Sequence, residues 1–460
     1  MRFVKVFGFA AACRRAGIEI RQLVGSVSDG ESERIPVIHR GSSVESGSEP
    51  YENVSVSVVI PVKDAGEEFR PLLSSLMMQK GFSKLEIVVV DSGSTDRSVE
   101  TAREFGAKLL QILPEEFSHS YARNLAVEHA AGDYILFMVQ DALPSSDHWL
   151  DELFSALRNN DVAAVSCAEY PRHDADLFYR VCCLGHYRFL DVDKHDRIMS
   201  KPKIENYLTM RKNAALSNLA CLMPRQLFLQ YKFRGNFGED LDLGLRMIRD
   251  GHKLVMLSST RVIHSHNRSA FYHLKRGYAD ALLLCEMFSD FPIVNLNPYG
   301  LTQDIAFVRD VIDSLVEHLT RIRVGCSVSR ISKIVVNHYR SSKKRNQRVV
   351  TLARKNGYRD ERFDLFLVNI REQLGCCRYS ELDHDGVFLE IMQGATQNFL
   401  DYMDEFYETV DERLLDEFCS SLYKMLAFQC GFHLASCYAK GSEQIKRRLE
   451  ALNKELPRGV

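Results

Sequence analysis

Short apolar runs alternate with amphipathic segments between Ser55 and Ala168. The runs are rich in β-branched residues and predict buried strands, whereas apolar residues at steps of three and four predict helices. The expected strands are 55–60, 85–90, 108–112, 134–139 and 162–168, and the expected helices are 67–79, 95–105, 120–131 and 149–160. Ser94 or Thr95 is the expected N-cap of the second helix, which Gly106 ends. This alternation is typical of a parallel sheet covered by helices on both faces.

The pattern changes on both sides of this region. Residues 25–52 are rich in Ser, Gly and Glu and hold few large apolar residues, so they are interpreted as a linker. In the C-terminal part, apolar residues at helical spacing and the run 399–430 predict helices. The apolar residues at helical spacing are Ile305, Val308, Ile312, Leu315 and Leu319. We therefore expect an N-terminal segment and linker over 1–52, an α/β domain over 53–290 and a mainly helical domain of unknown role over 291–460.

Composition adds few constraints on function. A chain of 460 residues suggests two or three domains. The formal net charge of -2 argues against a global attraction to nucleic acid or acidic surfaces. The 12 cysteines show no CxxC spacing, and no apolar run approaches the length of a membrane span, so we expect a reduced, cytoplasmic protein. Residues 1–16 either form a helix packed on the protein or dock on a membrane surface.

Polar and acidic residues follow three of the expected strands. Ligands bind at the carboxyl ends of strands in an open parallel sheet, so these positions are candidate ligand contacts. A single acid there could be an ordinary solvated loop residue, but three at one sheet edge indicate a site. The first strand ends in Pro61, Val62, Lys63 and Asp64, the second runs into Asp91, Ser92, Gly93 and Ser94, and the fourth runs into Gln140 and Asp141, so each strand end carries one acid.

Several segments resemble the family-two glycosyltransferases, whose fold is called GT-A. They are VSVVIPVKDAGEEFRPLLSSLMMQ, EIVVVDSGSTDRSVETA and YARNLAVEHAAGDYILFMVQDALPSSDHWL. The segments FSHSYARN, SNLACLMPRQLF, FGEDLDLGLRMIRDGHKL and VIHSHNRS are most similar to bacterial rhamnosyltransferases of polysaccharide assembly. The resemblance covers about residues 53–280. It implies an α/β GT-A fold, with a mostly parallel sheet flanked by helices, ahead of the mainly helical C-terminal region.

The resemblance implies inverting transfer of a sugar, with rhamnose a candidate, from a nucleotide diphosphate donor to a hydroxyl of a glycan or lipid-linked acceptor. The implied nucleotide-sugar contacts are Pro61, Val62, Asp64, Asp91, Ser92, Gly93, Arg123 and Gln140. A carboxylate at Asp91 that accepts the N3 proton of uracil or thymine would favour dTDP- or UDP-linked donors. Arg123 would lie near the diphosphate, because a planar cation suits phosphate oxygens. A surface helix charge is the alternative for Arg123.

The family's Asp-x-Asp metal motif is reduced here to Val139, Gln140 and Asp141. Mg²⁺ often binds through one or two carboxylates together with substrate phosphates, so we still expect an Mg²⁺ or Mn²⁺ site at Asp141. The resemblance adds His264 and, in second place, His266. Both imidazoles could face one side of the expected strand 253–264. Either could instead support a metal ligand or be structural.

Glu239 and Asp240 precede a helix whose apolar residues recur at steps of four and three. Acids in a first helical turn stabilise the helix dipole, and Asp242 is assigned that role. The resemblance implies that Asp240 is the catalytic base, which takes the acceptor proton. Glu239 would support the acceptor or Asp240.

A local basic run lies in the helical domain. It consists of Arg340, Lys343, Lys344, Arg345, Arg348, Arg354 and Lys355. It is either a solvated helix face or a contact with anionic lipid or a lipid diphosphate at the inner face of a membrane. No aromatic platform accompanies it, so no nucleic acid partner is expected.

Two other functions compete with sugar transfer. A sugar nucleotidyltransferase would need a glycine-rich loop after the first strand, where VKDAGEEF has one glycine. A catalytically silent member of the fold that binds carbohydrate or a partner is suggested by Val139, but Asp141, Asp240 and His264 oppose it.

Overall fold

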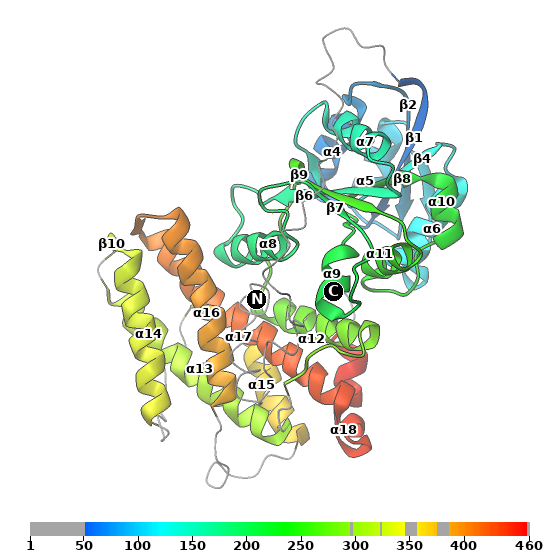
Figure 1. The fold of residues 1–460 in the computed structure, drawn as a ribbon. Coiled ribbons are helices and arrows are strands. Elements are labelled where there is room, and N and C mark those ends of the chain that lie inside the picture. Colours follow the sequence, from blue (N-terminus) through cyan, green and yellow to red (C-terminus); the bar gives the residue numbers. More distant parts are fainter. Residues whose placement is uncertain (1–50, 295–297, 323, 346–356, 375–385, 458–460) are drawn as a thin grey trace. The chain divides into compact units, whose positions relative to one another are not determined.

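The computed structural model describes residues 51–294, 298–322, 324–345, 357–374 and 386–457 (Figure 1). The predictions for residues 1–50 and for the basic residues after Arg345 up to Lys355 lie outside these ranges. Contacts between Cα atoms divide the chain into two compact units. An α/β unit lies within 29–174 and 186–265, and a helical unit lies within 175–185 and 266–460.

The first half of the sheet in the α/β unit is parallel. It contains β1 (Tyr51–Val62), β2 (Phe82–Asp91), β3 (Lys108–Gln111) and β4 (Tyr134–Met138), in the spatial order β3-β2-β1-β4. Each strand contains an apolar run that the sequence predicts. The carboxyl ends of β1, β2 and β4 therefore meet at one edge, as the sequence analysis requires.

The second half of the sheet is mixed. It contains β5 (Leu143–Pro144), β6 (Ala164–Tyr170), β7 (Arg197–Met199), β8 (Ala220–Pro224) and β9 (Leu254–Ile263). Strand β8 lies antiparallel between β4 and β6, whereas β6 and β9 are parallel and β5 and β7 pair antiparallel with β9. The expected mostly parallel arrangement thus holds for the first half only, because β8 reverses the direction in the middle.

Helices flank this sheet. Those that follow the strands of the first half and lead into the second are α4 (Phe69–Met77), α5 (Ser98–Glu104), α6 (His119–His129) and α7 (Trp149–Asn159). Shorter helices follow at α9 (Tyr207–Asn213), α10 (Arg225–Tyr231) and α11 (Glu239–Arg249), and single 3-10 turns lie at 66–68 and 114–116. Phe69, Trp149 and Phe154 are fully or almost fully buried and join α4 and α7 to one apolar cluster with β1.

One helix boundary was predicted wrongly. Helix α5 begins at Ser98 with Arg97 as its N-cap residue, so neither Ser94 nor Thr95 caps it. The Asp96 carboxylate accepts hydrogen bonds from the backbone amides of Ser98 and Gly66. These contacts keep residues 94–97 in a loop next to the end of β1.

Within the described ranges, the helical unit contains the first part of α8 (Leu177–Phe189) and seven further helices. They are α12 (Ala270–Met287), α13 (Pro298–Thr320), α14 (Val328–Arg345), α15 (Glu361–Leu374), α16 (Val387–Phe406), α17 (Glu412–Lys440) and α18 (Glu443–Glu455). The predicted apolar stripe of α13 is buried in their core. The predicted helical run 399–430 is divided between α16 and α17 by the short strand β11 (Thr409–Val410), which pairs with β10 (Cys326–Ser327).

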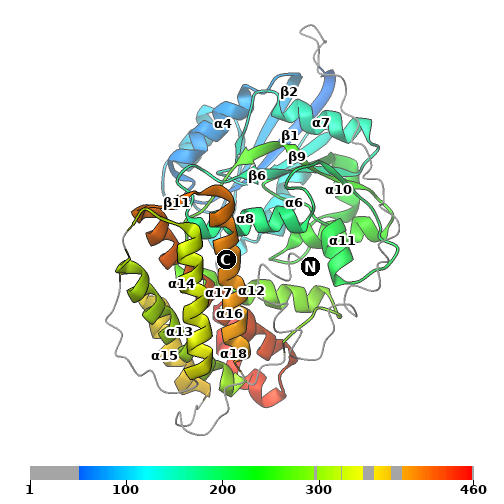
Figure 2. The ribbon, with the colours of Figure 1, turned by 60° about the vertical axis from the view of Figure 1, so that its left-hand side comes forward.

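Helix α12 packs closely along α17 within the helical unit (Figure 2). A Cβ atom at Gly277 would lie 2.2 Å from the carbonyl oxygen of Phe428, and one at Gly431 would lie 2.0 Å from that of Leu274. This contact explains why the compact units divide at His266, whereas the sequence analysis places the boundary at 290. Among the described residues, no helix has the length and apolarity that crossing a membrane requires.

Candidate active site

The ends of β1 and β4 are joined by a reciprocal pair of hydrogen bonds. The backbone amide of Lys63 donates to Gln140 Oε1 at 2.9 Å, and Gln140 Nε2 donates to the carbonyl of Lys63 at 3.2 Å. In the sheet register, Val62 of β1 pairs with Asp91 of β2. Residues that follow three different strands are thus brought to one edge, as predicted.

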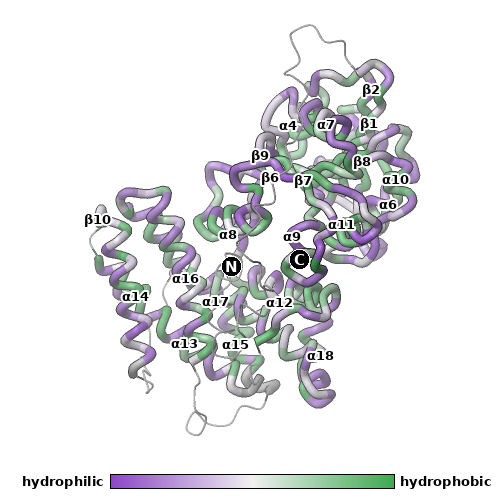
Figure 3. The backbone as a smooth tube through the Cα atoms, viewed as in Figure 1, coloured by the Kyte–Doolittle hydropathy of each residue, from purple (hydrophilic) through white to green (hydrophobic). Residues whose placement is uncertain are grey.

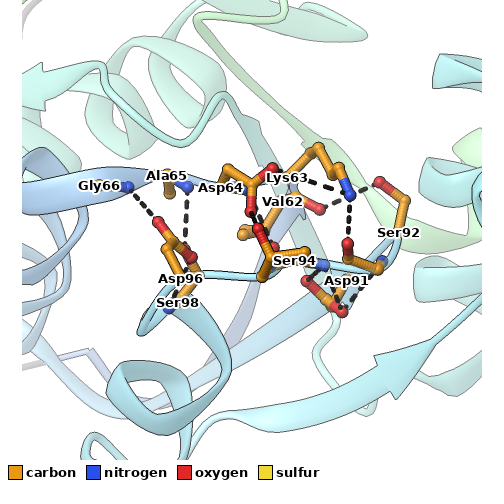
Figure 4. Close-up of polar contacts among 12 residues, drawn as sticks. Val62, Lys63, Asp64, Ala65, Gly66, Asp91, Ser92, Ser94, Asp96 and Ser98 are labelled. Atoms are coloured by element: carbon orange, nitrogen blue, oxygen red, sulfur yellow. Dashed lines mark hydrogen bonds and ion pairs between the residues drawn. The ribbon is translucent and has the colours of Figure 1, made fainter.

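The loop after β2 is built around two carboxylates (Figure 4). Asp91 accepts hydrogen bonds from the backbone amides of Gly93 and Ser94, each at 3.1 Å. Asp64 accepts from the backbone amide of Thr95 at 2.6 Å and from its hydroxyl at 3.1 Å. The hydrogen bond from the Thr95 amide is the main reason why the pKa of Asp64 is lowered. Gly93 has a φ of +85°, which favours glycine at this turn.

The predicted nucleotide contacts differ in their access to solvent. Pro61, Val62, Asp91 and Ser92 are buried, and Asp91 is only 1% exposed. Asp64 is exposed, and Gly93 and Gln140 are partly exposed. Asp64, Gly93 and Gln140 are thus open to a ligand, whereas Asp91 can meet one only if the loop that covers its carboxylate moves.

A possible metal site lies after β4 and β9. Asp141, His264 and His266 each offer a ligand atom, and these atoms all lie within 4.8 Å of one another. Both predicted histidines therefore accompany Asp141. A carboxylate with two imidazoles fits a divalent cation.

Side chains outside the predicted set hold these ligands in place. His264 Nδ1 lies 2.8 Å from Glu169 Oε2, which leaves Nε2, 3.7 Å from Asp141 Oδ1, on the side of the cluster. A carboxylate that bonds one imidazole nitrogen in this way orients the other toward a metal. Arg172 Nη2 donates to the Asp141 carbonyl at 2.8 Å, and its backbone amide donates to Ser265 Oγ.

The amino end of α11 carries a buried ion pair. Arg123 Nη1 lies 2.7 Å from Glu239 Oε1, with the two side chains 3% and 9% exposed. Asn218 Nδ2 donates to the same oxygen at 2.9 Å. Arg123 is therefore not the surface helix charge that the sequence left open. Arg123 belongs to α6, so this ion pair connects α6 with the start of α11.

Asp240 lies beside this ion pair. Burial is the main reason why the pKa of Asp240 is raised, and the neighbouring charge of Glu239 raises it further. Burial and then the charge of Arg123 lower the pKa of His119 to about 4, while Asp240 acts in the opposite direction. His119 is therefore neutral near pH 7, and its Nδ1 atom has no hydrogen-bond partner among the described residues.

The third acid of this turn has a structural role. Asp242 Oδ2 accepts from Arg246 Nε at 2.9 Å, and Arg246 also donates to the carbonyls of Tyr231 and Lys232. These contacts hold the loop before α11 against the helix. On the opposite side, a Cβ atom at Gly244 would lie 2.0 Å from the carbonyl oxygen of Ala214, so α11 approaches the end of α9 closely.

Sequence reasoning missed four residues of this region: His119, Glu169, Arg172 and Asn218. Glu169 lies one residue beyond the predicted end of its strand, so the rule used for Asp64, Asp91 and Asp141 could have found it. His119 and Asn218 stand within quoted motifs, but nothing in their spacing indicates their proximity to Glu239 or Asp240. Arg172 carries no sequence signal of its role.

The α/β unit thus carries loops joined at the carboxyl ends of β1 and β4, a carboxylate–imidazole cluster and two acids at the start of α11. Residues 57–212 match the family described as Glycosyl transferase family 2. The resemblance to family-two glycosyltransferases that was stated from the sequence is therefore confirmed over these residues.

Two relatives illustrate the similarity. The chain is 28% identical over 220 residues to the O-antigen chain rhamnosyltransferase WbaN of Salmonella anatum, a match that covers 46% of this chain and 67% of the relative. It is 26% identical over 219 residues to the O-antigen chain rhamnosyltransferase RfbN of Salmonella typhimurium, with the same coverage. Among solved structures, the mannosyltransferase PcManGT from Pyrobaculum calidifontis, in complex with GDP-Man and Mn²⁺, matches with a TM-score of 0.42 and 18% identity. That match covers 62% of this chain and 76% of that one.

Proposed function

We propose that this protein is an inverting glycosyltransferase of polysaccharide assembly. It moves a sugar, with rhamnose favoured by the names of its relatives, from a dTDP- or UDP-linked donor to a hydroxyl of a glycan or lipid-linked acceptor. The observation that carries the proposal is the cluster of Asp141, His264 and His266, of which Asp141 lies in the segment that matches the family-two glycosyltransferases.

The nucleoside is proposed to bind at the ends of β1 and β2. Asp64, Gly93 and Gln140 offer accessible polar groups there. The Asp91 carboxylate gives part of its acceptor capacity to the amides of its own loop, and a carboxylate has about four lone-pair sites. A remaining site can accept the N3 proton of uracil or thymine, which cytosine lacks.

The metal cluster is proposed to serve the diphosphate. Asp141, His264 and His266 would hold Mn²⁺ or Mg²⁺, which neutralises charge on the leaving diphosphate when it is bound. Glu169 fixes the orientation of the His264 ring, and Arg172 holds the backbone of Asp141. These two residues therefore act as positioning residues for the cluster.

Arg123 is proposed to act through Glu239. The resemblance places it near the diphosphate, but its guanidinium is buried against Glu239 in the described structure. Arg123 and Asn218 together hold Glu239 in one orientation beside Asp240. We therefore propose a positioning role for Arg123 and Glu239.

Asp240 is proposed as the catalytic base. Its raised pKa makes its carboxylate a stronger base than that of an ordinary aspartate. The acceptor hydroxyl gives its proton to this carboxylate while the acceptor oxygen bonds to the anomeric carbon and the bond from that carbon to the diphosphate oxygen breaks. A single displacement of this kind inverts the anomeric configuration.

Two measurements test the proposal. A thermal-shift screen of nucleotide sugars, with and without Mn²⁺, should show stabilisation by a dTDP- or UDP-linked donor, because a ligand stabilises the state that binds it. Single-turnover transfer from that donor should then fall about 10² to 10⁴-fold in Asp240→Asn, while donor binding is retained. Asp242→Asn is the matched control, because Asp242 bonds Arg246 and should cost little. A stable protein that neither binds nor hydrolyses any nucleotide sugar would support the catalytically silent alternative.

A further inference from the structure

The helix α14 contains no acidic residue. Its 18 residues include six Lys or Arg residues. The stretch without Asp or Glu runs further, over all 42 residues from His318 to Arg359, whereas 61 acids in 460 residues would place about five or six there. This segment is a local concentration of positive charge in a protein of net charge -2.

The basic residues of α14 lie on the side that faces solvent. Val328, Ile331, Val335 and Tyr339 are at most 2% exposed and form the packed face, and α14 contacts α13 and α16 in its own unit. Arg330, Lys333 and Arg340 are exposed and lie three and seven residues apart, which places them on one face of the helix. We call these three residues the basic face of α14. Hydrophilic and hydrophobic positions alternate along this helix (Figure 3).

No ion pair to Arg330, Lys333 or Arg340 is found within the described ranges, whereas Lys343 of the same helix pairs with Glu390 of α16. Acids do lie at the amino end of α14, where Asp404, Glu405 and Glu408 share a hollow with Ser327 and Ser329. The half of α14 near Arg340 is therefore its most positive part.

We propose that the basic face of α14 docks this protein on an anionic lipid bilayer. The three charges span about 15 Å along the helix, which suits a flat surface. The apolar face of α14 is already buried in the helical unit, so the attachment is electrostatic and does not insert the helix. The aromatic residue of this helix, Tyr339, is 1% exposed and offers no stacking platform to a nucleic acid.

This docking extends the proposed function, since a lipid-linked acceptor is presented at a membrane surface. Its test does not use transfer or donor binding. If the unmodified protein binds a donor but no vesicles, the docking alone is rejected. If it binds anionic vesicles but no donor, the proposed function alone is rejected.

The experiment is vesicle sedimentation with the full chain. Vesicles of phosphatidylcholine alone are compared with vesicles that contain phosphatidylglycerol, at low salt and at about 0.5 M salt. At the higher salt concentration, screening shortens the range of interaction between exposed charges to a few Å. The unmodified protein should bind only the anionic vesicles and only at low salt. The triple variant Arg330→Gln, Lys333→Gln and Arg340→Gln should bind about 100-fold more weakly, since each basic residue near such a surface contributes about fivefold.

The matched control removes three charges from α18 of the same unit. Arg447→Gln, Arg448→Gln and Lys454→Gln change the net charge equally and lie among acids of that helix, and this variant should bind almost as well as the unmodified protein. Circular dichroism melting should confirm that both variants fold, because all six positions are exposed. Equal losses in the two variants, binding to neutral vesicles, or no binding at low salt would each overturn the proposal. Tighter binding of a short oligonucleotide, lost in the α14 variant, would instead make this face a nucleic-acid surface.

Discussion

Replacing Glu239 by Gln tests two effects of this residue, one on the stability of the fold and one on the pKa of Asp240. The substitution keeps the size of the side chain and a partner for Asn218, but it removes the charge that faces Arg123 at 2.7 Å. Arg123 then remains buried without a counter-ion. Removing one partner of a buried pair typically costs about 3–5 kcal/mol, which corresponds to a fall of roughly 10 °C in Tm for a domain of this size.

The same change should shift the pH dependence of transfer. The charge of Glu239 raises the pKa of Asp240, and that of Arg123 lowers it. Without Glu239, its raising effect is lost while the lowering effect of Arg123 remains. The pKa of Asp240 therefore falls toward its ordinary value of 3.8. A base must be ionised to accept a proton, so the acidic limb of the rate profile should move to lower pH.

The assay is single-turnover transfer across acidic pH with donor saturating, together with thermal melting of each variant. Arg123→Met combined with Glu239→Gln removes the orphaned charge and should melt at a higher temperature than Glu239→Gln alone, which a double-mutant cycle measures directly. An unchanged acidic limb, or one that moves to higher pH, would show that Glu239 does not govern the titration of the base. A melting temperature equal to that of the unmodified protein would show that the buried pair contributes little.

Three further changes test other parts of the site. Gly244→Ala should destabilise the α/β unit by about 1–3 kcal/mol, because its Cβ atom would lie 2.0 Å from the carbonyl oxygen of Ala214; Gly357→Ala, with open space around it, is the matched control in thermal melting. Asp141→Ala should abolish the Mn²⁺ binding that calorimetry detects in the presence of a nucleoside diphosphate, and tight Mn²⁺ binding by this variant would mean that the ligands lie elsewhere. The unmodified protein should bind dTDP and UDP more tightly than CDP, and Asp91→Asn should remove that preference in competition assays; equal affinity for all three nucleotides would contradict the role of Asp91.

The first half of the fold was predictable because its strands are short, continuous apolar runs. Such runs are buried on both faces of a parallel sheet and stand out from the amphipathic helices between them. Strand β8 was not predicted, because five residues with no alternation resemble any short buried segment. Its place between β4 and β6 depends on pairing with residues more than fifty positions away in the chain, which local patterns do not contain.

The position of the candidate site could be predicted in the same way, but its contacts could not. The rule that ligands bind at strand ends brings Asp64, Asp91 and Asp141 to one edge, and the structure has them there. The partner of Arg123 could not be inferred, because Glu239 lies 116 residues away and either residue would be plausible on a helix surface. The two side chains form a buried ion pair, and only the folded structure shows that they are buried together.

The charges of the site also indicate how donor and metal should depend on each other. Asp64, Asp141 and Asp240 are acidic groups of this region, and its buried cation, Arg123, is already committed to Glu239. A nucleotide diphosphate would add further negative charge beside these acids, which is unfavourable without a compensating cation. A divalent ion held by Asp141, His264 and His266 would supply that compensation, and one carboxylate with two imidazoles would bind it weakly unless diphosphate oxygens joined the ligand set. Each ligand should therefore raise the affinity for the other by the same factor, as thermodynamic linkage requires. The loss of one acid from the family's triplet at Val139 makes this mutual dependence stronger, since the protein alone offers the ion less charge.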